Sequence, residues 1–89
     1  MKQRYLEVSY RHGRPLAAYF YLPRTTQDKS YRTSRADPGM IIDYAESGKP
    51  IGIEITDPVK ITVHDLNRVL ASLDVPVLSA DELTLLKAA

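Results

Sequence analysis

Residues 39–56 decide the fold: Gly39-Met-Ile-Ile-Asp-Tyr44, Ala45-Glu-Ser-Gly-Lys-Pro50 and Ile51-Gly-Ile-Glu-Ile-Thr56. Apolar residues recur here with the strand period of two, so that Ile51, Ile53 and Ile55 fall on one face. Gly48 suits the left-handed position that a tight hairpin loop needs, because it has no Cβ. The stretch therefore predicts two antiparallel strands joined by a hairpin.

A second hairpin is predicted upstream of the first. Residues 5–12 alternate between apolar and polar side chains, and residues 13–15 (Gly-Arg-Pro) are a turn signal. Residues 16–22 then form the returning strand, which is apolar on both faces, with Tyr19 and Tyr21 on the second one. A strand of this kind is usually covered on both faces. In so short a chain we expect the second cover to be a partner subunit.

The segment between the two hairpins has no apolar pattern. Residues 23–38 are rich in Thr, Ser, Arg, Lys and Asp, with Tyr31 as the single aromatic residue. We expect a long loop with at most a short strand near residues 31–34. Loops of this length inside a compact domain are functional or mobile, so this one is a candidate binding segment.

Helical signals replace the strand pattern in the C-terminal third. The pairs Thr62–Asp65 and Ser79–Glu82 both have the spacing of a capping box, followed by leucine-rich segments. They predict two short helices, the second reaching about Lys87.

The predicted fold class is α+β, with an antiparallel four-stranded meander sheet followed by two short C-terminal helices. We expect a single domain over residues 1–89. Its sheet region covers residues 1–57, interrupted by the loop 23–38, and a helical tail covers residues 58–89.

Composition narrows the function classes. The chain has 89 residues, of which 44% are hydrophobic and 26% are charged, and it contains no cysteine, which excludes disulfides and thiolate metal sites. Residues 1–36 carry a net charge of +6, and residues 37–89 carry −5. The two halves are expected to face each other within one fold or across a dimer. The longest uncharged apolar run, residues 16–22, is too short to cross a bilayer, so we predict a cytoplasmic protein without membrane contact.

The middle of the chain resembles a bacterial family of small proteins, domain of unknown function 2283. The resemblance is carried over residues 39–55 by Gly-x-x-x-Asp-Tyr and Gly-x-x-x-Gly-Ile-Glu-Ile, that is, by Gly39, Asp43, Tyr44, Gly48, Gly52 and Glu54. It implies structural roles for these residues. The biochemical role of the family is not established. For some members the resemblance implies an antidote-type partner of a neighbouring toxin-like protein. The family's acid-rich opening of the second strand is replaced here by residues 12–15 (His-Gly-Arg-Pro), so no acidic residue is carried over there.

Two acidic residues are the candidates for chemistry. A carboxylate pair such as Asp43 and Glu54 can perform acid–base catalysis. The simpler expectation is that Asp43 accepts hydrogen bonds from the Gly48 loop, and that Glu54 pairs with an Arg or Lys of a neighbouring strand. His12 and His64 lie far apart in the sequence, so we predict no metal site. The sequence contains no recognisable Ser-His-Asp or Cys-His grouping, G-x-S-x-G motif or phosphate-binding loop, so we predict no cofactor and no enzymatic activity.

Tyrosines interleave with basic residues along the chain, which indicates a binding surface. The candidate binding residues are Tyr19, Tyr21, Arg24, Tyr31, Arg32 and Arg35. The favoured function is a non-enzymatic protein–protein binding module that forms a homodimer, because tyrosine is also common at protein interfaces. The alternative is a nucleic-acid-binding domain that uses the basic loop 23–36, since open sheets bind single strands through aromatic residues and cations. A weaker alternative is an enzyme built on Asp43 and Glu54.

Overall fold

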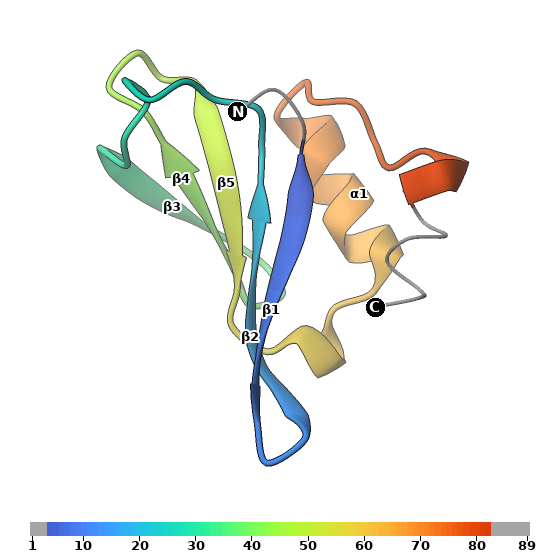
Figure 1. Ribbon diagram of the computed structural model, residues 1–89. Helices are drawn as coiled ribbons and strands as arrows, with labels where there is room; N and C mark the ends of the chain where they lie inside the picture. Colours follow the sequence, from blue (N-terminus) through green and yellow to red (C-terminus); the bar gives the residue numbers. More distant parts are fainter. Residues whose placement is uncertain (1–3, 83–89) are drawn as a thin grey trace.

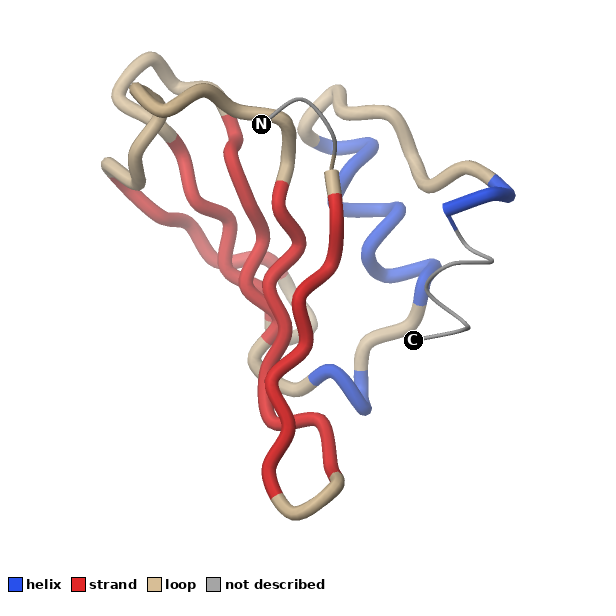
Figure 2. The backbone as a smooth tube through the Cα atoms, in the orientation of Figure 1, coloured by secondary structure: helices blue, strands red, loops and turns tan. Residues whose placement is uncertain are grey.

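The computed structural model describes residues 4–82, which form one antiparallel sheet of five strands with helical elements on one side (Figures 1 and 2). The strands are β1 (Tyr5–Arg11), β2 (Arg14–Tyr21), β3 (Arg32–Ala36), β4 (Met40–Tyr44) and β5 (Pro50–Ile55). The helical elements are the 3-10 helix η1 (Pro58–Lys60) and the α-helix α1 (Val63–Ser72). None of the helices in this part of the chain is long and apolar enough to span a membrane.

The predicted four-stranded meander is wrong in strand number and in strand order. The order is β1-β2-β5-β4-β3, so the chain crosses from β2 to the far edge of the sheet and returns through β4 to β5. The additional strand, β3, lies inside the predicted loop 23–38, where it overlaps the short strand that the sequence suggested near residues 31–34. It gives little apolar signal because it is an edge strand, with Arg32, Thr33 and Arg35 exposed to solvent.

Both predicted hairpins are confirmed, and each turn has the backbone that its sequence requires. His12 and Gly13 join β1 to β2 with φ values of 53° and 77°. Two consecutive positive φ values are typical of the two-residue turn whose twist matches that of the flanking strands. In the β4–β5 loop Gly48 has a φ of 92°, and the Ala45 amide donates to the Lys49 carbonyl at 2.9 Å. Local sequence therefore sets these two turns.

The first predicted helix is confirmed together with its capping box. The Asp65 amide donates to Thr62 Oγ1 at 3.1 Å, and the Thr62 amide donates to Asp65 Oδ2 at 2.9 Å. At the other end Asp74 has a left-handed φ of 57°, and the Val75 amide donates to the Leu70 carbonyl at 3.0 Å. This is the Schellman arrangement that satisfies the last carbonyls of a helix.

The second capping box also forms, although most of its predicted helix lies outside the described residues. The Glu82 amide donates to Ser79 Oγ at 3.2 Å, and the Ser79 amide donates to Glu82 Oε1 at 3.0 Å. Arg4 ties this segment to the start of β1, because its guanidinium contacts both carboxylate oxygens of Glu82 and donates to the carbonyls of Pro76 and Val77. Residues 83–87 of the predicted helix belong to the part that the structure does not describe.

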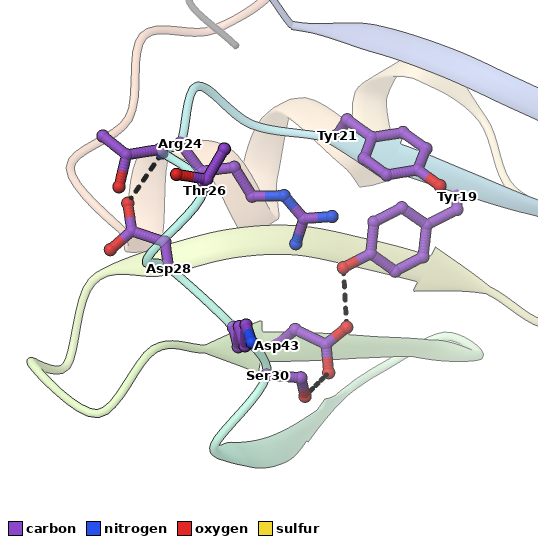
Figure 3. A pocket seen from close by; sticks show the side chains of 9 residues that line it. Tyr19, Tyr21, Arg24, Thr26, Asp28, Ser30 and Asp43 are labelled. Carbon is purple, nitrogen blue, oxygen red and sulfur yellow. Dashed lines mark hydrogen bonds between the residues drawn. The ribbon is translucent and has the colours of Figure 1, made fainter.

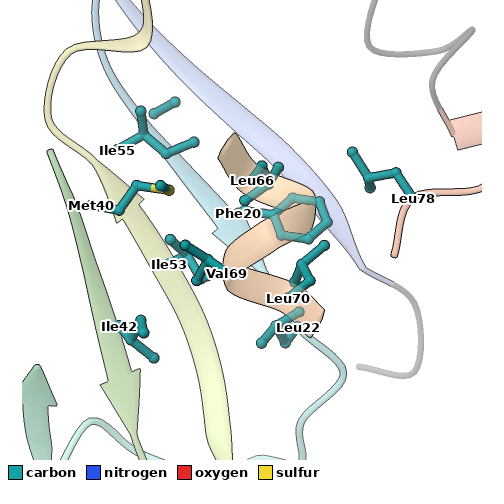
Figure 4. Close-up of a cluster of buried hydrophobic side chains, with 11 residues drawn as sticks. Phe20, Leu22, Met40, Ile42, Ile53, Ile55, Leu66, Val69, Leu70 and Leu78 are labelled. Carbon is teal, nitrogen blue, oxygen red and sulfur yellow. The ribbon is translucent and has the colours of Figure 1, made fainter. Parts of the chain in front are cut away.

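The core lies between one face of the sheet and α1 (Figure 4). Phe20 from β2, Ile53 from β5 and Leu70 from α1 are almost completely buried there. Side chains alternate along a strand, so the neighbours of these strand residues point to the opposite face of the sheet. We name that opposite face the outer face. Neither α1 nor η1 covers it (Figure 1), and among the described residues only the loop after β2 approaches it, at one end.

Candidate functional site

Three tyrosines form a continuous aromatic strip on the outer face. Tyr5 lies opposite Tyr21 in the register of β1 and β2, and their rings stack with centroids 4.5 Å apart and an interplanar angle of 18°. The Tyr19 ring follows at 4.5 Å from that of Tyr21, tilted by 56°. We name these side chains the tyrosine row. Tyr5 remains 46% exposed, so the row presents aromatic surface to solvent.

A cleft of about 530 Å³ opens at the end of the tyrosine row (Figure 3). Tyr19 and Tyr21 form one wall, and the loop after β2 supplies most of the rest. The other lining residues are Arg24, Thr25, Thr26, Asp28, Lys29, Ser30 and Asp43. The guanidinium of Arg24 points toward the tyrosines, and its carbon lies 5.3 Å from the Tyr21 ring centroid, within the range of a cation–π contact. We name this site the loop cleft.

Asp43 connects three segments of the chain at the floor of the loop cleft. Its Oδ2 accepts a hydrogen bond from the Tyr19 hydroxyl at 2.6 Å, and its Oδ1 accepts one from the Ser30 hydroxyl at 3.1 Å. Burial raises the pKa of the Tyr19 phenol far above its usual value, and the bond to Asp43 adds to this shift. Tyr19 therefore stays protonated and remains a donor. The predicted bonds from the Gly48 loop are wrong, because the Gly48 amide donates to the Ala45 carbonyl instead.

Gly52 makes the contact between Tyr19 and Asp43 possible. It lies opposite both Tyr21 and Asp43 in the sheet register, and the Tyr19 side chain passes over it toward β4. A Cβ at this position would lie 2.0 Å from the Tyr19 hydroxyl oxygen and 2.3 Å from two ring carbons. Any other residue would displace the ring, which gives this motif glycine its structural role.

The loop that carries the cations of the cleft is anchored at two points. The Thr25 amide donates to Asp28 Oδ2 at 3.0 Å, and Lys49 Nζ from the β4–β5 loop contacts the same oxygen at 2.8 Å. The hydrogen bond from Lys49 lowers the pKa of Asp28 below its usual value, so this carboxylate is engaged within the fold. The anchoring places Arg24 and Lys29 at the edge of the tyrosine row.

Glu54 does not form the predicted pair with a neighbouring cation. It is exposed on the outer face, opposite Tyr19 of β2 and Ile41 of β4, neither of which carries a charge. Within residues 4–82 no hydrogen bond or ion pair engages its side chain. The carboxylate is therefore available to a group outside the monomer.

The remaining family-motif residues have structural roles. Gly39 has a φ of 70° in the β3–β4 turn, and its carbonyl accepts bonds from the amide and the hydroxyl of Thr56 at 3.1 and 3.0 Å. Tyr44 packs against the core cluster, and its hydroxyl lies 3.3 Å from that of Ser34. These contacts fix β4 between β3 and β5.

The other three predicted binding residues lie outside the loop cleft. Tyr31 is 65% exposed just before β3, and Arg35 lies opposite Ile41 on the same edge strand. The guanidinium of Arg32 lies 4.2 Å from the ring centroid of Tyr44, which belongs to the core side of the sheet. The six candidates therefore do not form one surface, because strand alternation separates Arg32 from the cleft.

Several lining residues of the cleft carried no sequence signal of their own. Lys29 and Ser30 come from the stretch without an apolar pattern, so only the folded loop shows that they face Tyr19. Tyr5 is different, because its place on the outer face depends on an irregularity in the hairpin. A two-residue turn at 12–13 alone would set Tyr5 opposite Phe20, and the register shift between Ser9 and Tyr10 moves its partner to Tyr21. No group of three or more His, Cys, Asp or Glu residues suited to a metal ion occurs in the described range 4–82.

Comparison with known proteins identifies the segment that contains this site. Residues 17–57 match the family model described as Protein of unknown function (DUF2283). This segment belongs to that family. The DUF2283 segment runs from the middle of β2 through β5 and includes every residue that lines the loop cleft, whereas β1 and α1 lie outside it. No curated protein and no solved structure matches the chain.

Proposed function

We propose that the protein is a non-enzymatic protein-binding module that pairs with a second copy of itself through the outer face. The observation that carries this proposal is the exposed tyrosine row beside the loop cleft with its Arg24 and Lys29, on a sheet face that no described helix covers. Tyr and Arg are enriched among the residues that dominate the energetics of protein interfaces.

The packing of β2 supports the same proposal. Its core-side residues Ala18 and Phe20 lie beneath α1, while Tyr19 and Tyr21 point to the outer face, which neither α1 nor η1 covers. Two sheets that pack face to face bury side chains of this kind in a layer about 10 Å thick. A small domain without disulfides gains stability from such association.

A structural role for Asp43 favours binding over catalysis. Both of its carboxylate oxygens accept hydrogen bonds from hydroxyl groups of the fold, which makes it an anchor for Tyr19 and Ser30. Glu54 lies on β5, two residues after Gly52, which is the register partner of Asp43. Its own partner on β4 is the apolar Ile41. We therefore assign neither carboxylate to acid–base chemistry.

Nucleic-acid binding is the second candidate, and one observation favours it. Arg24 over the Tyr21 ring, next to the stacked Tyr5 ring, has the elements of a stacking platform for single strands. The carboxylates of Glu7 and Glu54 lie on either side of Tyr19 in the sheet register, however, and both would repel successive phosphates. For this reason we place a protein partner first.

Oligomeric state tests the proposal directly. Light scattering at micromolar concentration is expected to give a particle of twice the monomer mass of 10.0 kDa. Tyr5→Ser is expected to shift the population toward monomer. Val59→Ser removes an apolar side chain on η1 that is even more exposed, 72% against 46% for Tyr5, and is expected to leave the population unchanged. A wild-type particle of 10.0 kDa would contradict the proposal. An affinity pull-down with and without nuclease, read by native mass spectrometry, separates protein partners from nucleic acid.

A further inference from the structure

The outer face carries opposite charges at two different places. Arg24 and Lys29 lie in the loop cleft, at the end of the sheet where β2 leaves it. Glu54 lies one step away from that end, beside Tyr19, and its carboxylate has no partner among residues 4–82. Lys29 is likewise exposed and forms no ion pair within the same range. The monomer therefore leaves a cation and an anion uncompensated on one surface.

Twofold symmetry would bring these charges together. In an isologous dimer each contact occurs twice, because residue i of one copy meets residue j of the other and the reverse also holds. An axis that runs across the strands reverses the direction of the second sheet. When this axis passes between the loop cleft and Glu54, the loop cleft of each copy lies over Glu54 of the other. The tyrosine rows of the two copies would pack between the two charged contacts.

Other carboxylates of the outer face are less suited to this contact. Asp43 already accepts two hydrogen bonds inside the cleft, and Asp28 is engaged by Lys49. Glu7 accepts a long bond of 3.5 Å from the Tyr21 hydroxyl. Among the acidic residues that line this surface, Glu54 is the one with no such contact.

We propose that the loop cleft is the anion site of a homodimer and that the Glu54 carboxylate of the second copy occupies it, against Arg24 and Lys29. This inference rests on the proposed function and adds the residues that pair across the interface. Each monomer's site is incomplete without the other copy. The occupant is a carboxylate from a second copy of this chain. Binding of free phosphate or nucleic acid in its place would contradict the proposal.

Complementary charge reversal tests the pairing in the full-length chain. Lys29→Glu alone would place two carboxylates at each contact, and Glu54→Lys alone would place cations there. Because symmetry doubles each reversed contact, either variant is expected to raise the dimer dissociation constant on the order of 100-fold. In a mixture of the two variants, both contacts of the heterodimer are attractive. Native mass spectrometry is therefore expected to show heterodimer with an affinity within a few fold of wild type.

Matched variants control for net charge and for folding. Arg14→Glu and Glu46→Lys make the same charge changes at exposed positions outside the loop cleft, so both are expected to dimerise like wild type. Arg24→Glu combined with Lys29→Glu is a second disrupting variant, and circular dichroism checks that each chain is folded. A titration with inorganic phosphate is expected to leave the wild-type dimer intact at physiological salt.

The outcomes separate the two levels of the proposal. A monomeric wild type would overturn the proposed function and this inference together. A wild-type dimer that both single variants retain would overturn only the Glu54 pairing. The pairing would also be overturned if each single variant became monomeric and the mixture failed to form heterodimer, or if phosphate or an oligonucleotide displaced the second copy.

Discussion

The Tyr19 phenol lies over Gly52, at a distance that leaves no room for a Cβ on the glycine. This contact lets a side chain of β2 cross β5 and donate to Asp43 of β4. The middle three strands are thereby connected on the outer face by a polar bridge, in addition to their backbone ladders. The bridge also fixes the wall of the loop cleft, because Tyr19 is part of that wall.

Gly52→Ala is expected to destabilise the fold by about 1–3 kcal/mol, since the new methyl group forces the Tyr19 ring out of its position. The cost is expected to be much smaller in a Tyr19→Ala background, where the clash is absent. A double-mutant cycle by urea denaturation measures the difference, with a coupling of about 0.5–3 kcal/mol expected for residues in contact. Additive effects of the two substitutions would show that the contact carries no stability.

Asp43→Asn is expected to lower the free energy of unfolding by about 1 kcal/mol, because the amide nitrogen faces one of the two hydroxyl donors. Glu46→Gln, an amide substitution in an exposed loop, serves as the control. An enzymatic turnover that disappeared in Asp43→Asn would contradict the structural role.

The Arg4–Glu82 pair predicts a specific dependence of stability on pH. The Arg4 hydrogen bond lowers the pKa of Glu82 from its ordinary 4.5 to about 2. A carboxyl group whose pKa is lower in the folded state stabilises the fold fully above its unfolded pKa and loses this contribution as the pH falls. The difference in melting temperature between wild type and Glu82→Gln is therefore expected to be constant above about pH 5 and to shrink between pH 4.5 and 2.

The neighbouring variant Asp81→Asn controls for general acid effects. Asp81 is exposed, and no hydrogen bond or ion pair with a described residue engages its side chain. The melting temperature of the Asp81→Asn variant is expected to follow that of wild type over the same pH range. A wild-type advantage over Glu82→Gln that persisted unchanged at pH 2 would show that the pair does not contribute through its charge.

Local signals account for the part of the fold that the sequence predicts. The His12–Gly13 turn, the Gly48 loop and the Thr62–Asp65 capping box each depend on a few adjacent residues, and each forms as predicted. The strand order depends instead on pairing between β2 and β5, which lie about thirty residues apart in the chain. No short pattern encodes that pairing, so the meander was the simpler expectation.

The site shows the same division between local and distant contacts. The sequence places Tyr19, Tyr21 and Arg24 close together near the end of one strand. In the structure these three residues line one cleft. The donors to Asp43 come from β2 and from the loop after it, at separations of 24 and 13 residues. The sequence suggested the nearer Gly48 loop, because nothing local indicated that Gly52 opens a path for a tyrosine.

The last prediction separates protein binding from nucleic-acid binding. Arg32 stacks on Tyr44 on the core side of the sheet, so the structure leaves Arg24 and Lys29 as the basic pair that one strand would meet in the loop cleft. If these two residues contacted phosphates of a single strand, the log–log dependence of affinity on salt would have a slope of about −1.4, at −0.7 per contact. We expect no such binding tighter than about 10⁻⁴ M at physiological salt, because the carboxylates of Glu7 and Glu54 flank the tyrosine row. Titration of labelled single- and double-stranded oligonucleotides at two salt concentrations measures this. Micromolar, salt-sensitive binding that Arg24→Ala with Lys29→Ala abolished would instead make nucleic acid the ligand of the outer face.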